Sequence, residues 1–288
     1  MAKDDTTTAA LAALRRRIDE VDDGLHDLLI RRAELVDEVA RVKHRDDVAP
    51  FRPGREAQIL RRLVARHRGN FPRGALVRIW REIMAGGVVM QALVSVAVDA
   101  GCWDLARDHF GSQMPLLSVP SAEEATLAVA EGRASLGVVP LAVDDGADPW
   151  WLKLGVLDGD RPSVVARLPF GALGNAAGAC DDAVVLAAIV PEPSGDDCTL
   201  LVIETAAHAT AVLTDAFLAA HLDINPIAHR ERDGGGCAHL VEAAALIEPG
   251  DRRLALALAA LGDGARVTWL GCYARPLSDA LAGEVAPE

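Results

Sequence analysis

Apolar residues in the first part of the chain recur at steps of three and four, which is the period of an α-helix. Between Thr8 and Arg45 there is no proline, and the only glycine is Gly24. The pattern predicts a first helix of ~38 residues and ~57 Å. Because so long a helix cannot be covered by a small domain, its apolar stripe predicts a partner chain. The stripe consists of Leu11, Leu14, Ile18, Val21, Leu25, Leu28, Leu29, Leu35, Val36, Val39 and Val42.

Two shorter helices are predicted to follow the first one. Residues 46–54 form a loop with two prolines, and a second helix runs from about residue 54 to residue 67. A third helix covers about residues 73–91, and its inward-facing residues are Leu76, Ile79, Trp80, Ile83, Met84 and Val88. We therefore expect an all-α, three-helix domain over residues 1–91.

After residue 91 the pattern changes to short β-like runs. Strands at 93–98, 116–119 and 135–141 alternate with helices at 103–110 and 121–131, which predicts a small parallel α/β lobe. A loop-rich stretch from Pro149 then leads to a strand at 183–190. Residues 199–276 follow the order βαββαβ. The fold class is multi-domain α and α/β, with domains at 1–91, 92–196 and 197–288.

The balance of basic and acidic residues changes at the same boundary, near residue 91. Residues 1–91 hold 18 Lys and Arg against 14 Asp and Glu, whereas the remainder holds 11 against 28, so the whole chain carries −13. The basic part suggests contact with a small anion, and an ordinary solvated surface is the alternative. The acidic whole disfavours a nucleic-acid coat.

Other features narrow the class of protein. No apolar run reaches the ~18 residues of a membrane helix, and the polar N-terminus lacks a secretory signal. The five cysteines are scattered without a C-x-x-C pair, so the sequence signals neither a disulfide framework nor a zinc site. We expect a cytoplasmic protein that binds neither a membrane nor nucleic acid.

Three cations on the first helix could bind a small dianion. Arg32 and Lys43 are 11 positions apart, which places them about 20° from each other around the helix and ~16 Å along it. Arg15 lies ~25 Å from Arg32 along the axis. It cannot serve the same pocket from the same chain, but in an antiparallel dimer it could reach the partner's pocket.

Residues 9–91 resemble the all-helical (type II) chorismate mutases. The resemblance is carried by Ala13–Asp19, Leu28–Leu35, Val42-Lys43, Arg52–Leu60 and Ile79–Met84 through Gln91. Enzymes of this family are intertwined helical homodimers that convert chorismate to prephenate on the route to phenylalanine and tyrosine. The reaction is an intramolecular Claisen rearrangement that needs no nucleophile, metal or cofactor. The resemblance therefore implies an isomerase without a cofactor.

The resemblance also implies roles for the cations. Arg32 of one chain and Arg15 of the other would hold the substrate carboxylates, which match the planar fork of a guanidinium. Lys43 and Gln91 would donate to the ether oxygen, where negative charge builds up.

Further residues of the implied site lie on the second and third helices. Glu56 would accept the ring hydroxyl, and Arg55 would line the site beside it. Arg52 stands where several relatives carry an acid, and Gly87 where some carry a small hydroxyl residue. We expect activity to survive both departures, with weaker binding.

The second half resembles part of a prephenate dehydratase, most clearly over Ala128–Pro140. After that proline the family pattern ends, and Ala183-Val184-Val185-Leu186 stands near the place of the Thr-Arg-Phe motif that carries dehydration. We therefore expect dehydration to be lost. The βαββαβ segment is similar to an ACT domain, a small regulatory module, but lacks its two phenylalanine-binding motifs.

The sequence leaves other functions open. The chain could be a bifunctional or amino-acid-regulated mutase–dehydratase, or a catalytically dead relative that binds a ligand or another protein. Nucleic-acid binding by the Arg-rich helices is the weakest alternative, because no aromatic platform accompanies the charge.

Overall fold

The computed structural model describes residues 2–43, 51–141, 149–156, 161–171, 180–206, 210–232 and 235–277. Contacts between Cα atoms divide the chain into two units. The first unit contains residues 1–50 and 90–92. The second contains residues 51–89 and everything from residue 93 onward. Within the described residues, no helix is long and apolar enough to cross a membrane.

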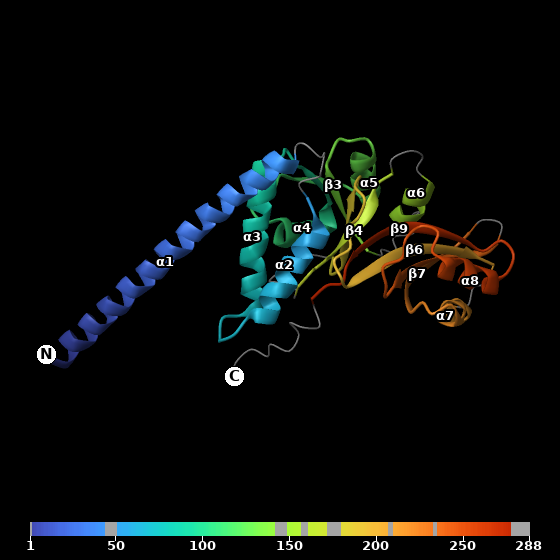
Figure 1. Ribbon diagram of the computed structural model, residues 1–288. Coiled ribbons are helices and arrows are strands. Elements are labelled where there is room, and N and C mark those ends of the chain that lie inside the picture. The colour runs from blue at the N-terminus through green and yellow to red at the C-terminus, as the bar shows by residue number, and fades with distance from the viewer. Residues whose placement is uncertain are drawn as a thin grey trace. The chain divides into compact units, whose positions relative to one another are not determined.

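The first unit is dominated by one uninterrupted helix, α1 (Ala2–Lys43), as Figure 1 shows. The predicted long helix is confirmed, and it begins several residues earlier than expected. The predicted loop that follows lies mostly outside the described residues. Large apolar side chains from Leu11 to Val42 are 45–68% exposed, so most of the predicted stripe has no cover in the described structure.

Helices α2 (Pro53–Arg66) and α3 (Arg73–Gln91) occur as predicted. Pro53 stands in the first turn of α2, where its missing N–H group costs no helical hydrogen bond. One apolar cluster contains residues of both helices together with Phe170 and Leu277. Apolar packing therefore joins these helices to the α/β part of the chain.

The buried face of α3 differs from the predicted one. Val77, Arg81, Met84 and Val88 are buried, whereas Ile79 is 44% exposed. The predicted inward position of Ile79 is wrong. The buried positions are spaced by four, three and four residues and form one stripe. That stripe includes a charged residue, which a search for apolar positions passes over.

A nine-stranded mixed sheet forms the body of the second unit, in the order β2-β1-β3-β5-β4-β9-β6-β8-β7. The strands are β1 (Val96–Asp99), β2 (Leu116–Val119), β3 (Leu136–Pro140), β4 (Ser163–Leu168), β5 (Ala183–Ala187), β6 (Asp197–Thr205), β7 (Ile224–Glu231), β8 (Cys237–Ala243) and β9 (Arg266–Ala274). The helices between them are α4 (Trp103–Phe110), α5 (Ala122–Ala130), α6 (Trp150–Val156), α7 (Thr210–Ala219) and α8 (Arg252–Leu261).

The expected parallel lobe proves to be mixed. β1 pairs in parallel with β2 and β3, but β5 runs antiparallel to both β3 and β4. The prediction of a loop-rich stretch after Pro149 is also wrong, because this stretch contains α6 and β4. Both elements are short, and β4 has buried residues on both faces, so neither shows the alternation that marks a half-exposed strand.

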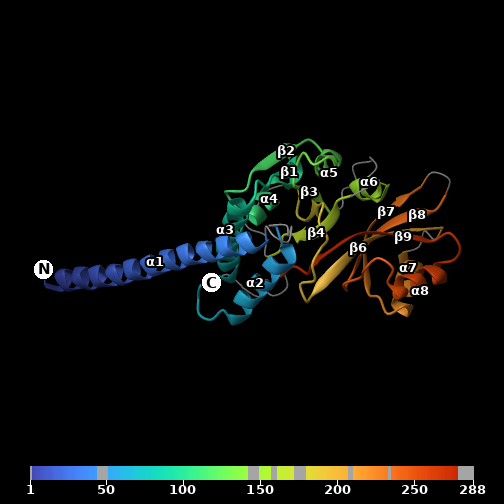
Figure 2. The same ribbon diagram turned by 45° about the horizontal axis from the view of Figure 1, so that its top comes forward.

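The βαββαβ order of the last part is confirmed, and its strands pair in the order β9-β6-β8-β7. Helices α7 and α8 lie on one face of these strands (Figure 2). Along β6, Leu201 and Ile203 pack against these helices, whereas Leu200 and Val202 belong to the main core. Successive side chains of a strand point to opposite faces, so β6 separates two apolar layers.

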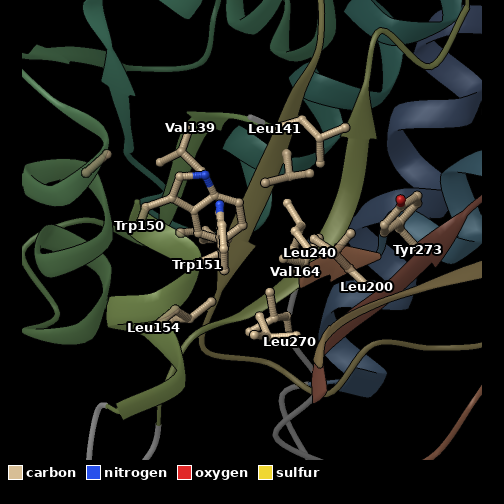
Figure 3. Packing of buried hydrophobic residues seen from close by; sticks show 14 of the residues in the cluster. Val139, Leu141, Trp150, Trp151, Leu154, Val164, Leu200, Leu240, Leu270 and Tyr273 are labelled. Carbon is tan, nitrogen blue, oxygen red and sulfur yellow. The ribbon is translucent and has the colours of Figure 1, made fainter. Parts of the chain in front are cut away.

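The main core lies on the other face of β6, as Figure 3 shows. Trp150 and Trp151 of α6 are 4% and 2% exposed and pack with Leu200, Leu240 and other residues of the sheet. The indole N–H of Trp150 donates to the carbonyl oxygen of Pro140 at 2.7 Å. The two tryptophans therefore form one core with strands from both proposed C-terminal domains.

The sheet is continuous across those two domains at a single glycine. β4 pairs with β9 in parallel, with Val164 opposite Gly271. Gly271 has a φ of +149°, and a Cβ atom on it would lie 2.1 Å from the carbonyl oxygen of Val164. Only glycine combines this conformation with such close approach of two backbones.

Candidate active site

The predicted cations lie along α1. Arg15 is exposed and Arg32 is half-buried. Lys43 is the last residue of α1, and its side chain lies outside the described part of the chain. Gln91 is half-buried and belongs to the same unit as α1. The other predicted residues, Arg52, Arg55, Glu56 and Gly87, belong to the second unit.

Glu56 lies in the first turn of α2 and pairs with an arginine of α3. Its Oε2 atom accepts a hydrogen bond from Nη1 of Arg81 at 2.8 Å, and the side chains of Glu56 and Arg81 are 13% and 6% exposed. A largely buried carboxylate needs such a partner to remain charged. Arg81 therefore gives the Glu56 carboxylate a cationic partner and holds it in one place.

Arg81 is surrounded by apolar and aromatic groups of the α/β part. Its guanidinium carbon lies 5.0 Å from the centre of the Phe170 ring, a cation–π geometry. Burial lowers the pKa of Arg81, and the charge of Glu56 offsets part of this effect. The buried charge of Arg81 is therefore stabilised by the Glu56 carboxylate and by the ring of Phe170.

His109 of α4 lies close enough to Arg81 to feel its charge. Burial, and secondly the charge of Arg81, lower the pKa of His109 well below its ordinary value of 6.5. Its Nε2 atom is buried and has no hydrogen-bond partner in the described part of the chain. His109 is therefore neutral at pH 7 beside a buried cation.

Arg52 and Arg55 make different contacts. The Arg52 guanidinium donates to both carboxylate oxygens of Glu192, with its shortest contact, from Nη2 to Oε2, at 2.7 Å. Arg55 is exposed and donates to Oε1 of Gln58 at 3.2 Å. Gly87 is buried within α3. The charge of Arg52 is thus neutralised by an acid from the segment between β5 and β6.

The same segment also holds α2 further along the helix. Arg61 donates from Nη1 to Oγ of Ser194 at 2.9 Å and from Nη2 to the carbonyl oxygens of Asp196 and Arg275, at 2.6 and 2.9 Å. At Gly54, a Cβ atom would lie 2.6 Å from the carbonyl oxygen of Glu192. Close backbone packing at Gly54 and the hydrogen bonds of Arg61 therefore attach α2 to residues 192–196.

Sequence reasoning missed Arg81, Phe170 and His109. A signal for Arg81 was present, because it follows Val77 by four residues and precedes Met84 by three, on the apolar face of α3. A charged residue at such a position is buried and needs a partner. Nothing in the local pattern identifies Phe170 or His109, because only the tertiary fold brings them to Arg81.

The strand at the expected place of the dehydratase motif is wholly apolar. Ala183-Val184-Val185-Leu186 forms most of β5, and each of these residues is 0% exposed. The nearby cation Arg167 of β4 is held between Asp182 and Glu242, both at 2.5 Å. Because these four residues are Ala, Val, Val and Leu, this part of β5 has no charged or hydroxyl side chain that could act on a substrate.

Comparison with known families identifies the first part of the chain. Residues 14–92 match the family described as chorismate mutase type II. This segment is therefore similar to the type II chorismate mutases, which are isomerases.

Curated relatives extend the similarity beyond that domain. The chain is 33% identical over 140 residues to a bifunctional chorismate mutase/prephenate dehydratase of Pseudomonas aeruginosa, and 31% identical over 140 residues to one of Stutzerimonas stutzeri. Each match covers 46% of this chain and 38% of the relative. The chain thus spans less than half the length of these curated relatives. A prephenate dehydratase structure from Streptococcus mutans aligns over 62% of this chain and 97% of its own, with 17% identity and a TM-score of 0.44.

Proposed function

We propose that the protein is a chorismate mutase, which rearranges chorismate to prephenate in the biosynthesis of phenylalanine and tyrosine. The observation that carries this proposal is the match of residues 14–92 to the type II chorismate mutases. The cations and polar groups expected at the site occur in that segment. Because the rearrangement is intramolecular, the protein has to bind one compact conformer and stabilise charge on the breaking ether bond.

In the proposed site, arginines bind the two carboxylates. Arg32 comes from one protomer and Arg15 from the other, and Lys43 and Gln91 donate to the ether oxygen. Each donor to developing charge is worth about 3–4 kcal/mol in the transition state. Arg15 and Lys43 are on one straight helix, with ~42 Å between their backbones, which supports a site shared between chains.

The remaining roles fall to residues of α2 and α3. Glu56 accepts the substrate hydroxyl through a carboxylate that Arg81 holds in place. Arg55 lines the site, Arg52 takes the position of the acid found in several relatives, and Gly87 leaves space at the end of α3. Because Arg52 already pairs with Glu192, we propose that it shapes the site mainly by positioning the start of α2.

The proposed assembly is a homodimer formed by the first helices. The large apolar residues of α1 that are exposed between Leu11 and Val42 support this assembly. Exposed apolar stripes of this size are normally covered by a partner. A second copy of α1 in antiparallel orientation would bury the stripe and bring Arg15 to the other chain's Arg32.

For the acidic half we propose a degenerate dehydratase region over residues 92–196 and an ACT-like domain over 197–288. The buried apolar residues of β5 support the loss of dehydration. The βαββαβ order with strand order β9-β6-β8-β7 supports the ACT-like assignment. A cytoplasmic location remains a prediction from the sequence.

The second candidate is a bifunctional mutase–dehydratase, which the names of the curated relatives favour. One experiment separates the candidates. Purified protein is incubated with chorismate, the loss of chorismate absorbance is followed, and the product is tested for phenylpyruvate. Prephenate without phenylpyruvate supports the mutase alone, and phenylpyruvate supports the bifunctional enzyme. Unchanged chorismate contradicts both and supports a dead relative.

Regulation by an amino acid is tested separately. Calorimetric titration with phenylalanine and with tyrosine should give heat if the ACT-like region binds either one. No heat with either amino acid would remove the regulatory alternative and leave the mutase proposal unaffected.

A further inference from the structure

A cavity of about 750 Å³ lies where β4 and β9 join the two proposed C-terminal regions. Its lining includes Trp269 and Cys272 of β9 and residues of the segments 188–193 and 246–249. None of the described residues that line it belongs to the candidate active site. Small-molecule sites typically have a volume of about 300–1,000 Å³ and often lie between domains. The cavity therefore has the size and the position of a separate ligand site.

The walls of the cavity are mainly apolar. Val190, on one wall, is 87% exposed although it is a large hydrophobic residue. Trp269 is half-buried, and its indole N–H already donates to the carbonyl oxygen of Ile247 at 2.9 Å. The indole therefore needs no polar partner from a ligand and offers its ring for packing, which favours a ligand with an aromatic body.

Arg161 supplies a cation to this apolar lining. Its guanidinium donates from Nη2 to the carbonyl oxygen of Trp269 at 3.0 Å and from Nη1 to that of Gly155 at 3.3 Å. Both acceptors are neutral, and Arg161 forms no ion pair with a carboxylate among the described residues. Because a guanidinium has five N–H donors, Arg161 retains donors that match the planar fork of a carboxylate.

The wall formed by residues 188–193 is held in place from its other side by α2. Glu192 of this segment pairs with Arg52, and the carbonyl oxygen of Pro193 accepts from Nε2 of Gln58 at 3.4 Å. Pro193 itself lines the cavity. A wall that is already fixed loses little conformational freedom when a ligand binds, so the cavity is largely formed before binding.

We propose that this cavity binds a small aromatic monocarboxylate. The carboxylate pairs with the guanidinium of Arg161, and the aromatic body packs against Trp269 and the wall around Val190. A ligand with one anionic group is favoured over a dianion, because the carboxylate of Glu248 also lines the cavity and repels a second negative charge.

The first test compares two ligands that differ only in charge. The full-length protein is titrated calorimetrically with 1-naphthylacetate and with the neutral 1-naphthylacetamide. The carboxylate should bind about tenfold more tightly, as expected for hydrogen bonds between charged groups, and Arg161→Gln should abolish this preference. No binding of the carboxylate, equal affinity for both ligands, or a preference that persists in Arg161→Gln would overturn the proposal.

The second test fills the cavity without altering Arg161. Val190→Trp places a large side chain in the cavity at an exposed position, and Val212→Trp, at a position of α7 that is 48% exposed and does not line the cavity, is the matched control. Val190→Trp should weaken binding of 1-naphthylacetate at least about tenfold, whereas Val212→Trp should leave it unchanged. Unaltered binding in Val190→Trp would place the ligand elsewhere and overturn the proposal, even if Arg161→Gln does not fold.

Discussion

Gly271 is the residue at which the two halves of the sheet meet, and replacing it tests whether that junction holds the fold together. In Gly271→Ala, the new Cβ atom would lie 2.1 Å from the oxygen and 2.5 Å from the nitrogen of Val164, where an ordinary contact is at least 3.4 Å. These are backbone atoms, so no side chain can rotate away. β4 and β9 must move apart, which breaks the Val164–Gly271 pairing.

The expected cost has two sources. Alanine at a φ of +149° costs about 1–3 kcal/mol in backbone strain, and forcing an extra carbon into a packed site costs about 1–3 kcal/mol more. The sum of about 2–6 kcal/mol is a large fraction of the 5–15 kcal/mol that typically stabilises a folded protein. We expect Gly271→Ala to be severely destabilised or to fail to accumulate.

Urea unfolding followed by circular dichroism measures the change, and Gly264→Ala is the matched control. Gly264 also has a positive φ, +92°, but a Cβ atom there would meet nothing within 4 Å. The control therefore carries the strain without the clash, at about 1–3 kcal/mol. Equal losses of unfolding free energy in the two variants would refute the steric argument.

Three further predictions concern the site and its support. Lys43→Ala should reduce the turnover of chorismate more than a hundredfold, since a donor to developing charge is worth about 3–4 kcal/mol. Gel filtration should show the same assembly as for the unaltered protein, and near-normal turnover would rule out the assigned role of Lys43. Gly54→Ala should lower the free energy of unfolding by about 1–3 kcal/mol, because its Cβ atom would lie 2.6 Å from the Glu192 carbonyl oxygen. The control in urea unfolding is Gly74→Ala, whose Cβ atom would meet nothing within 4 Å. Below pH 6.5 His109 takes up a proton in the unfolded protein but not in the folded protein, so the free energy of unfolding should fall by about 1.4 kcal/mol for each pH unit below this value. His109→Gln should remove this part of the pH dependence. An unchanged slope of unfolding free energy against pH would contradict the assignment.

The long helical elements were predictable because their residues signal them locally. The period of α1 and the Ser121 cap of α5, which accepts from the N–H of Glu124, need no tertiary information. By contrast, β4 lies inside the sheet, and its antiparallel neighbour β5 follows it in the chain only after a long connection. Strand direction in such a lobe depends on long-range pairing, and a single sequence carries no local sign of it.

The residues of the candidate site also divide into those with a local sequence signal and those that only the tertiary fold brings together. The cations of α1 and the Arg55-Glu56 pair were visible as polar residues at fixed helical spacings. Arg81 was missed although its place on the apolar face of α3 was a signal, because a search for apolar positions passes over a charged residue and its partner Glu56 lies on another helix.

The proposal that each site takes Arg15 from one protomer and Lys43 from the other is tested most directly by mixing two inactive variants. Arg15→Ala and Lys43→Ala are combined in equal amounts, unfolded together, refolded and assayed with chorismate. Random pairing gives hybrids in half of the dimers, and each hybrid has one intact site, so the mixture should recover about a quarter of the unaltered activity. A mixture no more active than the two variants measured separately would contradict a shared site.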